Sequence, residues 1–345
     1  MSNTMRAMIY TAPGNIELLE LPQPRPECDE VLIRVAYVGI CGSEIEAFVS
    51  NSPRRRPPLI MGREFSGTVV AVGERVAGIN VDAKVVINPL IPCGDCHLCR
   101  MGRTNVCPNR QLLSMHRPGA YAEYVSVPAR AIYELPSGLD LKRAALVEPL
   151  ANAVHAMRIV SNPVMHNVAI IGAGTIGLLC MQVARSMGAA RILVSEPSAH
   201  RREVARKLGA NQTVDSSRED LFAAGATFTY GCGFDVCIDA VGRATTRKQA
   251  VQLLAPVGTA VWIGLHERDA EINAMDVVTN EFRIQGSYAY TDADFRKAIQ
   301  LLADGYIVTD GWVTEVPFTD GVEAFLELAS GESGRVKVVL QFDGK

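Results

Sequence analysis

The first third of the chain is built from short apolar runs separated by polar breaks. These runs are rich in β-branched residues, lie between Val31 and about Ile132, and are divided by glycine, proline and asparagine. They read VLIRVAYVGI, GTVVAVGERV, AKVVINPL and AYAEYVSVP. Runs of this length without a 3.6-residue repeat are typical of strands. The pattern predicts an all-β, partly open barrel without helical periodicity as the first domain, residues 1–148.

After Leu135-Pro136 the pattern changes to strands that alternate with helices. Helical stretches are expected over 142–160, from the glycine-rich turn at 172–177 to Gly188, over 199–208 and before Pro256. The strand-like runs are VAIIGAG, RILVSEP, DVCIDAVG, GTAVWIG and RIQGSYAY. Such alternation indicates an α/β domain with a doubly wound parallel sheet, here residues 149–285. Residues 286–345 are expected to return to the first domain.

Composition and charge narrow the functional classes. Hydrophobic residues make up 48% of the 345-residue chain and aromatic residues 6%, which excludes disorder and gives no sign of stacking platforms for nucleic acid. The net charge of -3 comes from 34 basic and 37 acidic residues mixed along the chain, so no strong field favours polyanions or membrane surfaces. The longest apolar run, Val168 to Ala184, contains three glycines, and no secretory leader is evident. We expect a cytoplasmic protein with a small-molecule partner, and no nucleic-acid or membrane partner.

A dinucleotide-binding motif follows the first strand of the predicted parallel sheet. Gly172-Ala173-Gly174-Thr175-Ile176-Gly177 satisfies G-x-G-x-x-G and opens a helix, whose free N–H groups attract a pyrophosphate. The next strand ends in Glu196, and a carboxylate there accepts hydrogen bonds from ribose hydroxyls and repels a 2′-phosphate. The motif therefore predicts NAD(H) in preference to NADP(H). Arg201 and Arg202 are either a solvated helix face or a phosphate clamp.

Four cysteines lie close together near residue 100. Cys93-x2-Cys96-x2-Cys99-x7-Cys107 offers four thiolates on one loop, at spacings that suit a tetrahedral Zn²⁺ site. Three of them fall within seven residues, which disfavours disulfides, and the other five cysteines are scattered. The spacing predicts a structural zinc, since no coordination position remains for water.

With these two motifs in this order, the chain resembles the zinc-containing medium-chain alcohol dehydrogenases, in particular sorbitol and other polyol or sugar-alcohol dehydrogenases. The resemblance implies a GroES-like partly open barrel joined to a Rossmann domain, with substrate in the crevice between them. Val38-Gly39-Ile40-Cys41-Gly42-Ser43, Gly62-Arg63-Glu64-Phe65-Ser66-Gly67 and Val147-Glu148-Pro149-Leu150 look like the family's three catalytic-zinc segments. It also implies cofactor contacts at Ile263, Gly264, Leu265, Ser287, Tyr288, Ala289 and Lys337, and a homotetramer assembled near 283–290.

Three positions depart from the family pattern. Arg63 stands where the family has its ligand histidine, Glu44 where it has aspartate, and Glu46 where many members have a proton-relay histidine. An arginine has no free lone pair and stays protonated, so it cannot bind zinc, and its charge opposes the metal. We expect the catalytic zinc to be weakened or absent. Arg63 then either neutralises neighbouring carboxylates or replaces the metal as an electrophile.

Each candidate site residue can also be explained without a catalytic or binding role. Cys41 alone is typical of a buried structural thiol, and Glu44, Glu46, Glu64 and Glu148 are compatible with surface carboxylates. The apolar sequence around Glu64 and Glu148 favours function for these two. The run Arg54-Arg55-Arg56 either attracts a phosphorylated or acidic sugar or is solvated, and the latter is more typical of a proline-flanked loop.

The sequence predicts an NAD-dependent oxidoreductase that transfers hydride between nicotinamide and a secondary alcohol, polyol or sugar derivative. In a metal-dependent form, Cys41, Glu64 and Glu148 hold residual zinc and Ser43 passes the proton outward. In a metal-free form, Arg63 stabilises the alkoxide and a glutamate takes the proton. The alternative from another class is a catalytically silent NAD-binding sensor or assembly protein on the same fold.

Overall fold

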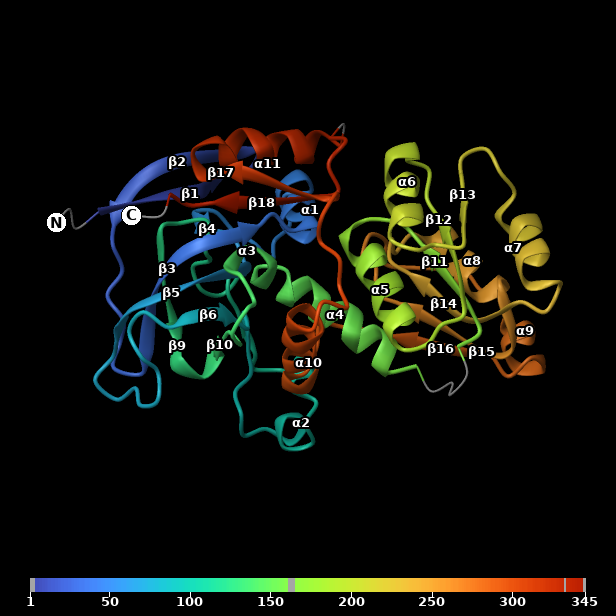
Figure 1. Cartoon of the computed structure of the whole chain (residues 1–345), viewed down its shortest axis with the longest axis horizontal. Helices are drawn as coiled ribbons and strands as arrows, with labels where there is room; N and C mark the ends of the chain where they lie inside the picture. The colour runs from blue at the N-terminus through green and yellow to red at the C-terminus, as the bar shows by residue number, and fades with distance from the viewer. Residues whose placement is uncertain (1–3, 161–164, 332, 344–345) are drawn as a thin grey trace. The chain divides into compact units, whose positions relative to one another are not determined.

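A computed structural model describes residues 4–160, 165–331 and 333–343 of the chain (Figure 1). The chain divides into two compact units. The first unit comprises Met1–Glu148, Ala298–Ala303 and Trp312–Lys345, and the second comprises Pro149–Lys297 and Asp304–Gly311. Residues 286–297 and 304–311 thus group with the second unit, whereas the sequence assigned them to the return segment.

The first unit is built mainly from β-strands. Its strands are β1 (Thr4–Ala12), β2 (Asn15–Pro22), β3 (Glu30–Gly39), β4 (Leu59–Ile60), β5 (Glu64–Val72), β6 (Lys84–Ile87), β7 (Leu90–Ile91), β8 (Gln111–Leu112), β9 (Tyr124–Pro128), β10 (Ile132–Glu134), β17 (Val313–Pro317) and β18 (Lys337–Gln341). The largest sheet has the order β10-β6-β5-β3-β18-β17, with β9 also paired to β3. The β-branched runs seen in the sequence form these strands, and the predicted partly open barrel is confirmed.

The C-terminal segment completes this sheet. Strand β18 pairs antiparallel with β3, so that Val339 lies opposite Gly39 and Leu340 opposite Val38. Side chains from both ends of the chain therefore share one core, which includes Val38, Phe65, Val338 and Leu340. Full burial of each such side chain stabilises the fold by about 1.5–3 kcal/mol.

The first unit also contains helices. They are α1 (Gly42–Val49), α2 (His97–Arg100), α3 (Leu141–Ala144) and α11 (Gly321–Ser330), with the 3₁₀ turns η1 (Thr104–Val106), η2 (Ala129–Ala131) and η3 (Phe318–Asp320). The expectation of a barrel without helices between residues 31 and 132 was therefore wrong at α1 and at the single turn α2. Eight residues give too few turns for a helical repeat to stand out. Tertiary packing stabilises this helix, because Phe48 of α1 packs against Phe325 of α11, with ring centroids 5.2 Å apart.

The second unit is a parallel sheet with helices on both faces. Its strands are β11 (Asn167–Ile171), β12 (Arg191–Ser195), β13 (Gln212–Val214), β14 (Phe234–Asp239), β15 (Leu254–Trp262) and β16 (Arg283–Gly286). They follow the order β13-β12-β11-β14-β15-β16, and every pair is parallel. This is the predicted doubly wound Rossmann arrangement, with the switch point between β11 and β14.

Most helices of this unit connect successive strands, whereas the first precedes the sheet and the last follows it. They are α4 (Val147–Arg158), α5 (Thr175–Ser186), α6 (Ala199–Lys207), α7 (Leu221–Thr229), α8 (Ala244–Gln252), α9 (Ala274–Thr279) and α10 (Asp292–Ala303). Helices α5 and α6 lie on one side of the sheet and α7, α8 and α9 on the other (Figure 1). Right-handed crossovers place them so, because the strand order reverses direction at β11. In the described ranges, no helix combines the length and apolar character needed to cross a membrane.

Candidate functional site

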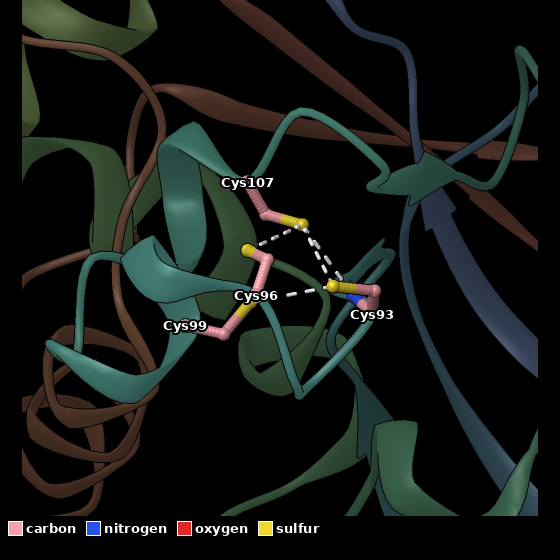
Figure 2. Close-up of side chains that lie close together, drawn as sticks. All are labelled: Cys93, Cys96, Cys99 and Cys107. Atoms are coloured by element: carbon pink, nitrogen blue, oxygen red, sulfur yellow. Dashed lines mark hydrogen bonds between the residues drawn. The ribbon is translucent and has the colours of Figure 1, made fainter.

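The four cysteines of the lobe point toward one another (Figure 2). Their sulfur atoms all lie within 4.8 Å of one another. The Cys93–Cys107, Cys96–Cys107 and Cys93–Cys99 sulfur pairs are 3.5, 3.8 and 3.9 Å apart. Four sulfurs at about 2.3 Å from a central zinc are about 3.8 Å apart, whereas a disulfide needs about 2.05 Å. The geometry fits a tetrahedral zinc site and not a pair of disulfides.

Local backbone structure brings these sulfurs together. Cys96 is the N-cap residue of α2 and Cys99 lies in its single turn, so the two cysteines are three residues, about one helical turn, apart. Cys107 follows η1 and accepts a weak hydrogen bond at 3.5 Å from the N–H of Cys93. His97 lies outside the four-sulfur group. A zinc held by these four sulfurs would have no open coordination position and would stabilise the lobe.

The glycine-rich turn connects β11 to α5. Gly174 is the N-cap residue of α5 and has no side chain to bond the first N–H groups of the helix, which are therefore available to an anion. At Gly177, a Cβ atom would stand 1.8 Å from the carbonyl oxygen of Gly172, so only glycine allows the helix to start this close to the strand. Thr175 and Ile176 are the first two residues of α5. The turn fits a dinucleotide pyrophosphate.

Glu196 lies directly after β12 and is only 5% exposed. One of its carboxylate oxygens accepts a 2.8 Å hydrogen bond from the N–H of Ala173, and the other accepts one of 3.0 Å from the N–H of Ser198. The Glu196 carboxylate therefore stabilises the glycine-rich turn. Each of its oxygens has a second lone pair that can accept a hydrogen bond from a ribose hydroxyl. Its neighbour Arg202 is committed elsewhere, since it donates to the Glu196 carbonyl and to the Asp215 carboxylate.

The other expected cofactor contacts lie at the carboxyl ends of strands, except for Arg201 and Lys337. Ile263, Gly264 and Leu265 follow β15, and Ser287, Tyr288 and Ala289 follow β16. Among the described residues, buried polar atoms without a hydrogen-bond partner occur at Trp262 Nε1 and Ser287 Oγ at these strand ends, and at Ser195 Oγ at the end of β12. Arg201 lies on α6, beyond Glu196. Lys337 lies on β18 in the first unit.

The three expected zinc-binding segments meet in the first unit, but with Arg63 among them. Arg63 Nη2 donates a hydrogen bond to Cys41 Sγ at 3.0 Å. Arg63 Nε lies 3.8 Å from Glu148 Oε1, which is an ion pair but too long for a hydrogen bond. The guanidinium therefore bridges the residues that the resemblance assigns as metal ligands.

Glu64 is held by Lys337. The two side chains form a direct ion pair, are 3% and 2% exposed, and come from positions 273 residues apart in the chain. Lys337 Nζ also donates to the carbonyl oxygen of Ile40 at 2.8 Å. Within the described ranges, the four lobe cysteines are the only group of three or more donor residues that could hold a metal, so Cys41, Glu64 and Glu148 are not arranged as a ligand set.

Two further contacts surround this cluster. Glu44 is fully buried, accepts the N–H of Gly62 at 3.0 Å and accepts the hydroxyl of Tyr121 at 2.7 Å. It therefore has a structural role, which the sequence left open. Glu46 lies on the same helix but is half-buried, as expected for residues two apart on a helix.

Arg55 also belongs to the site, although the sequence grouped it with two solvated neighbours. It is 4% exposed, and its guanidinium donates to the Ser43 carbonyl at 3.0 Å, the Ser43 hydroxyl at 3.4 Å and the Ser114 carbonyl at 3.1 Å. Ser43 Oγ is 3.5 Å from Cys41 Sγ. A run of three arginines carries no periodicity that marks the middle one as buried, so only the fold identifies it.

Burial and charge control the protonation states here. Burial, partly offset by Arg63, raises the pKa of Cys41 to about 11, so its thiol is neutral near pH 7. Burial alone would lower the pKa of Arg63, but Cys41, Glu148, Glu44 and Glu64 raise it well above its usual value. The pKa of Arg55 is lowered by burial and by Arg63. Arg63 is therefore a permanent cation beside a protonated thiol.

Comparison with known proteins agrees with this fold and these motifs. The family described as alcohol dehydrogenase GroES-like domain matches residues 27–137, and that described as zinc-binding dehydrogenase matches residues 175–304. L-threonine 3-dehydrogenase of Pyrococcus horikoshii is 34% identical over 99% of this chain and 100% of its own length. D-arabitol-phosphate dehydrogenase of Enterococcus avium is 34% identical over 98% of each chain.

A solved structure is similar over the same length. The crystal structure of a putative zinc-binding dehydrogenase from Sinorhizobium meliloti 1021 bound to NADP has a TM-score of 0.92, with 34% identity over 99% of this chain and 100% of that one. Its similarity covers both units. The chain is therefore an oxidoreductase that belongs to the zinc-containing medium-chain alcohol dehydrogenase family.

Proposed function

We propose that this chain is an NAD(H)-preferring dehydrogenase acting on a secondary alcohol, polyol or sugar derivative, and that its catalytic zinc is weakened or absent. One observation carries the proposal. Arg63 lies 3.0 Å from Cys41 Sγ and 3.8 Å from Glu148, between two of the expected ligands. The third, Glu64, is neutralised by Lys337. A relative at 34% identity is named for D-arabitol phosphate, which supports a polyol or its phosphate as substrate.

Arg63 can replace the electrophilic role of a metal. Its Nε–H is buried and has no hydrogen-bond acceptor within the described residues. We propose that this donor binds the reacting oxygen of the substrate and stabilises its alkoxide. The raised pKa of Arg63 keeps the guanidinium charged throughout. One preorganised donor of this kind typically contributes about 10²–10³ in rate.

We propose that Glu148, the carboxylate beside the Nε–H of Arg63, takes the proton. Glu44 is committed to Gly62 and Tyr121, and Glu64 to Lys337. Glu148 Oε1 lies 3.8 Å from Arg63 Nε, the donor that we propose for the reacting oxygen, and the Glu148 side chain is 7% exposed. Ser43, held by Arg55, is our proposed route by which the proton moves outward. NAD supplies the hydride acceptor when it is bound.

The cofactor-binding and metal residues complete the proposal. We assign the pyrophosphate to the turn Gly172, Gly174, Thr175, Ile176 and Gly177. Glu196, beside that turn, supports NAD(H) over NADP(H), because a buried carboxylate repels a 2′-phosphate. Cys93, Cys96, Cys99 and Cys107 would hold a single structural zinc. The remaining proposed cofactor contacts are Arg201, Ile263, Gly264, Leu265, Ser287, Tyr288, Ala289 and Lys337.

The same cluster supports an alternative, a catalytically silent NAD-binding protein. Arg63 already donates a hydrogen bond to the Cys41 sulfur, which would otherwise bind a metal. The glycine-rich turn and the cysteine lobe do not involve Arg63. Turnover separates the two functions. NADH formation across a panel of polyols and their phosphates is expected for the enzyme and would be absent for the silent protein.

A glutamate variant tests the proposed mechanism directly. Glu148→Gln keeps the shape of the side chain but cannot accept the proton, so kcat/KM should fall by about 10²–10⁴ and the acidic limb of its pH profile should disappear. Glu74→Gln, at an exposed position, is the matched control and should behave as the unmodified protein. An unchanged kcat/KM for Glu148→Gln would contradict the assignment.

Assembly and location are also part of the proposal. Strand β16 ends the order of the six-stranded sheet, and an edge strand presents backbone groups that a second copy can pair with. The neighbouring Met275 and Val278 are 68% and 73% exposed. We propose a homotetramer assembled through this edge, in the cytoplasm.

A further inference from the structure

Arg247 is a buried arginine that holds a single loop. It lies on α8, is 8% exposed, and its guanidinium lies 5.7 Å from the centre of the Trp262 ring. Its Nη1 donates to the carbonyl of Glu267 at 2.7 Å and to that of Arg268 at 3.4 Å, and its Nη2 donates to the carbonyl of Gly264 at 3.2 Å. All three acceptors belong to the loop 263–268, which follows β15.

The same loop is tied to the loop that follows β14. The N–H of Glu267 donates to the Gly242 carbonyl at 2.8 Å, and the Glu267 carboxylate accepts the N–H of Ala244 at 2.7 Å at the start of α8. At Gly264, a Cβ atom would stand 2.2 Å from the Gly242 nitrogen, so the two backbones touch. Together with the three hydrogen bonds from Arg247, these contacts leave the loop 263–268 little conformational freedom.

The strand order shows what this loop faces. In a doubly wound sheet, a dinucleotide lies across the carboxyl ends of the strands at the switch point, here between β11 and β14. The glycine-rich turn after β11 fits the pyrophosphate, and Glu196 after β12 places the adenosine ribose on the β12 side. The nicotinamide half must then extend the other way, over the ends of β14 and β15.

We infer that Arg247 is a positioning residue for the nicotinamide end of the cofactor, which it serves by holding the loop 263–268 in its binding conformation. This inference rests on the proposed NAD site. We assign Arg247 to the loop and not to the cofactor, because both terminal nitrogens of its guanidinium donate to loop carbonyls and only its buried Nε has no partner among the described residues. Without it, those carbonyls lose their donor and the loop samples other conformations. Part of the binding free energy would then be used to order the loop.

Binding of two ligands to the full-length protein tests this role. NADH carries the nicotinamide, whereas ADP-ribose has the adenosine, the pyrophosphate and the second ribose but no nicotinamide ring to contact the loop. If only about a tenth of the Arg247→Met molecules have the loop in its binding conformation, the NADH Kd should rise by about tenfold. The ADP-ribose Kd should stay within about twofold. Lys248→Met, an exposed neighbour on the same helix, is the matched control and should change neither Kd.

Two further measurements guard against a variant that fails to fold. Arg247→Lys keeps the charge but offers a single head group, so it should give an intermediate NADH Kd. In the unmodified protein, NADH but not ADP-ribose should slow amide hydrogen exchange in peptides covering 263–268. An unchanged NADH Kd in Arg247→Met, an equal weakening of both ligands, or equal protection by both would overturn the inference. These measurements need no turnover, so they are independent of whether the chain oxidises a polyol.

Discussion

Replacing Arg63 with histidine should restore a second zinc. The unmodified chain has a thiol and two carboxylates near the expected metal position, but a cation donates to that thiol at 3.0 Å. An imidazole in its place would supply a lone pair and remove the positive charge in one step. We therefore expect one zinc per chain in the unmodified protein and two in Arg63→His.

The structure sets the size of this effect. A zinc bound to Cys41 would lie about 2.3 Å from Sγ, and Arg63 Nη2 lies 3.0 Å from the same atom, so metal and cation would be at most about 5.3 Å apart. At an effective dielectric constant of about 20, a divalent ion and a unit charge at that distance repel each other by about 6 kcal/mol. This corresponds to about four orders of magnitude in metal affinity before the carboxylates offset part of it.

The assay is metal analysis of purified protein together with polyol-dependent NADH formation. Arg63→Met is the control, because it removes the charge without supplying a ligand and should keep one zinc. Arg54→Met, an exposed arginine in the neighbouring loop, should behave as the unmodified protein. Alcohol oxidation should rise only in Arg63→His.

Two results would refute this reasoning. Two zincs per chain in the unmodified protein would mean that Arg63 moves aside for the metal. No gain of metal in Arg63→His would mean that the Glu64–Lys337 pair, and not Arg63, prevents coordination.

Three other predictions concern the cofactor, the lobe and stability. Glu196→Gln removes the charge that repels a 2′-phosphate, so the ratio of NADPH to NADH Kd should fall by about tenfold, and tighter NADPH binding by the unmodified protein would contradict the idea. Cys96→Ser should release the lobe zinc and lower the melting temperature, and a folded protein with no zinc before mutation would rule this out. Asp294 accepts hydrogen bonds from His155, Arg158 and Thr291, which outweigh its burial and hold its pKa well below the usual value. Its carboxylate therefore stabilises the fold above about pH 4, and this contribution is lost as the pH falls through the folded-state pKa. Asp294→Asn should cost about 1–3 kcal/mol at pH 7 by chemical denaturation, with a smaller difference at pH 3, and an equal difference at both would contradict it.

Assembly provides a fifth test. Light scattering should give a mass near four times the 37.3 kDa of one chain. A mass near that of a single chain would exclude the proposed tetramer. A change of Arg283, on the edge strand β16, to glutamate in each copy should weaken assembly without altering the cysteine lobe.

The sequence predicted those parts of the protein whose chemistry is local. The four lobe cysteines fall within fifteen consecutive residues, and the turn Gly172 to Gly177 lies between a strand and the helix it opens. Such motifs depend on spacing along the chain, because neighbouring backbone atoms alone bring the groups together. The alternation of strands and helices likewise predicted the parallel sheet, since a buried strand and an amphipathic helix have different hydrophobic periods.

Only the tertiary structure determined which side chains of the candidate active site contact one another. Lys337 meets Glu64 from 273 residues away, and Tyr121 meets Glu44 from 77 residues away. Arg55 is buried against Ser43, although the arginines on either side of it are exposed. Arg247 contacts the loop after β15, and no sequence motif predicts that contact. A charged side chain is equally compatible with solvent and with a buried partner until the fold supplies that partner. The sequence could therefore show that Arg63 cannot bind zinc, but only packing decided that it contacts Cys41 and Glu148.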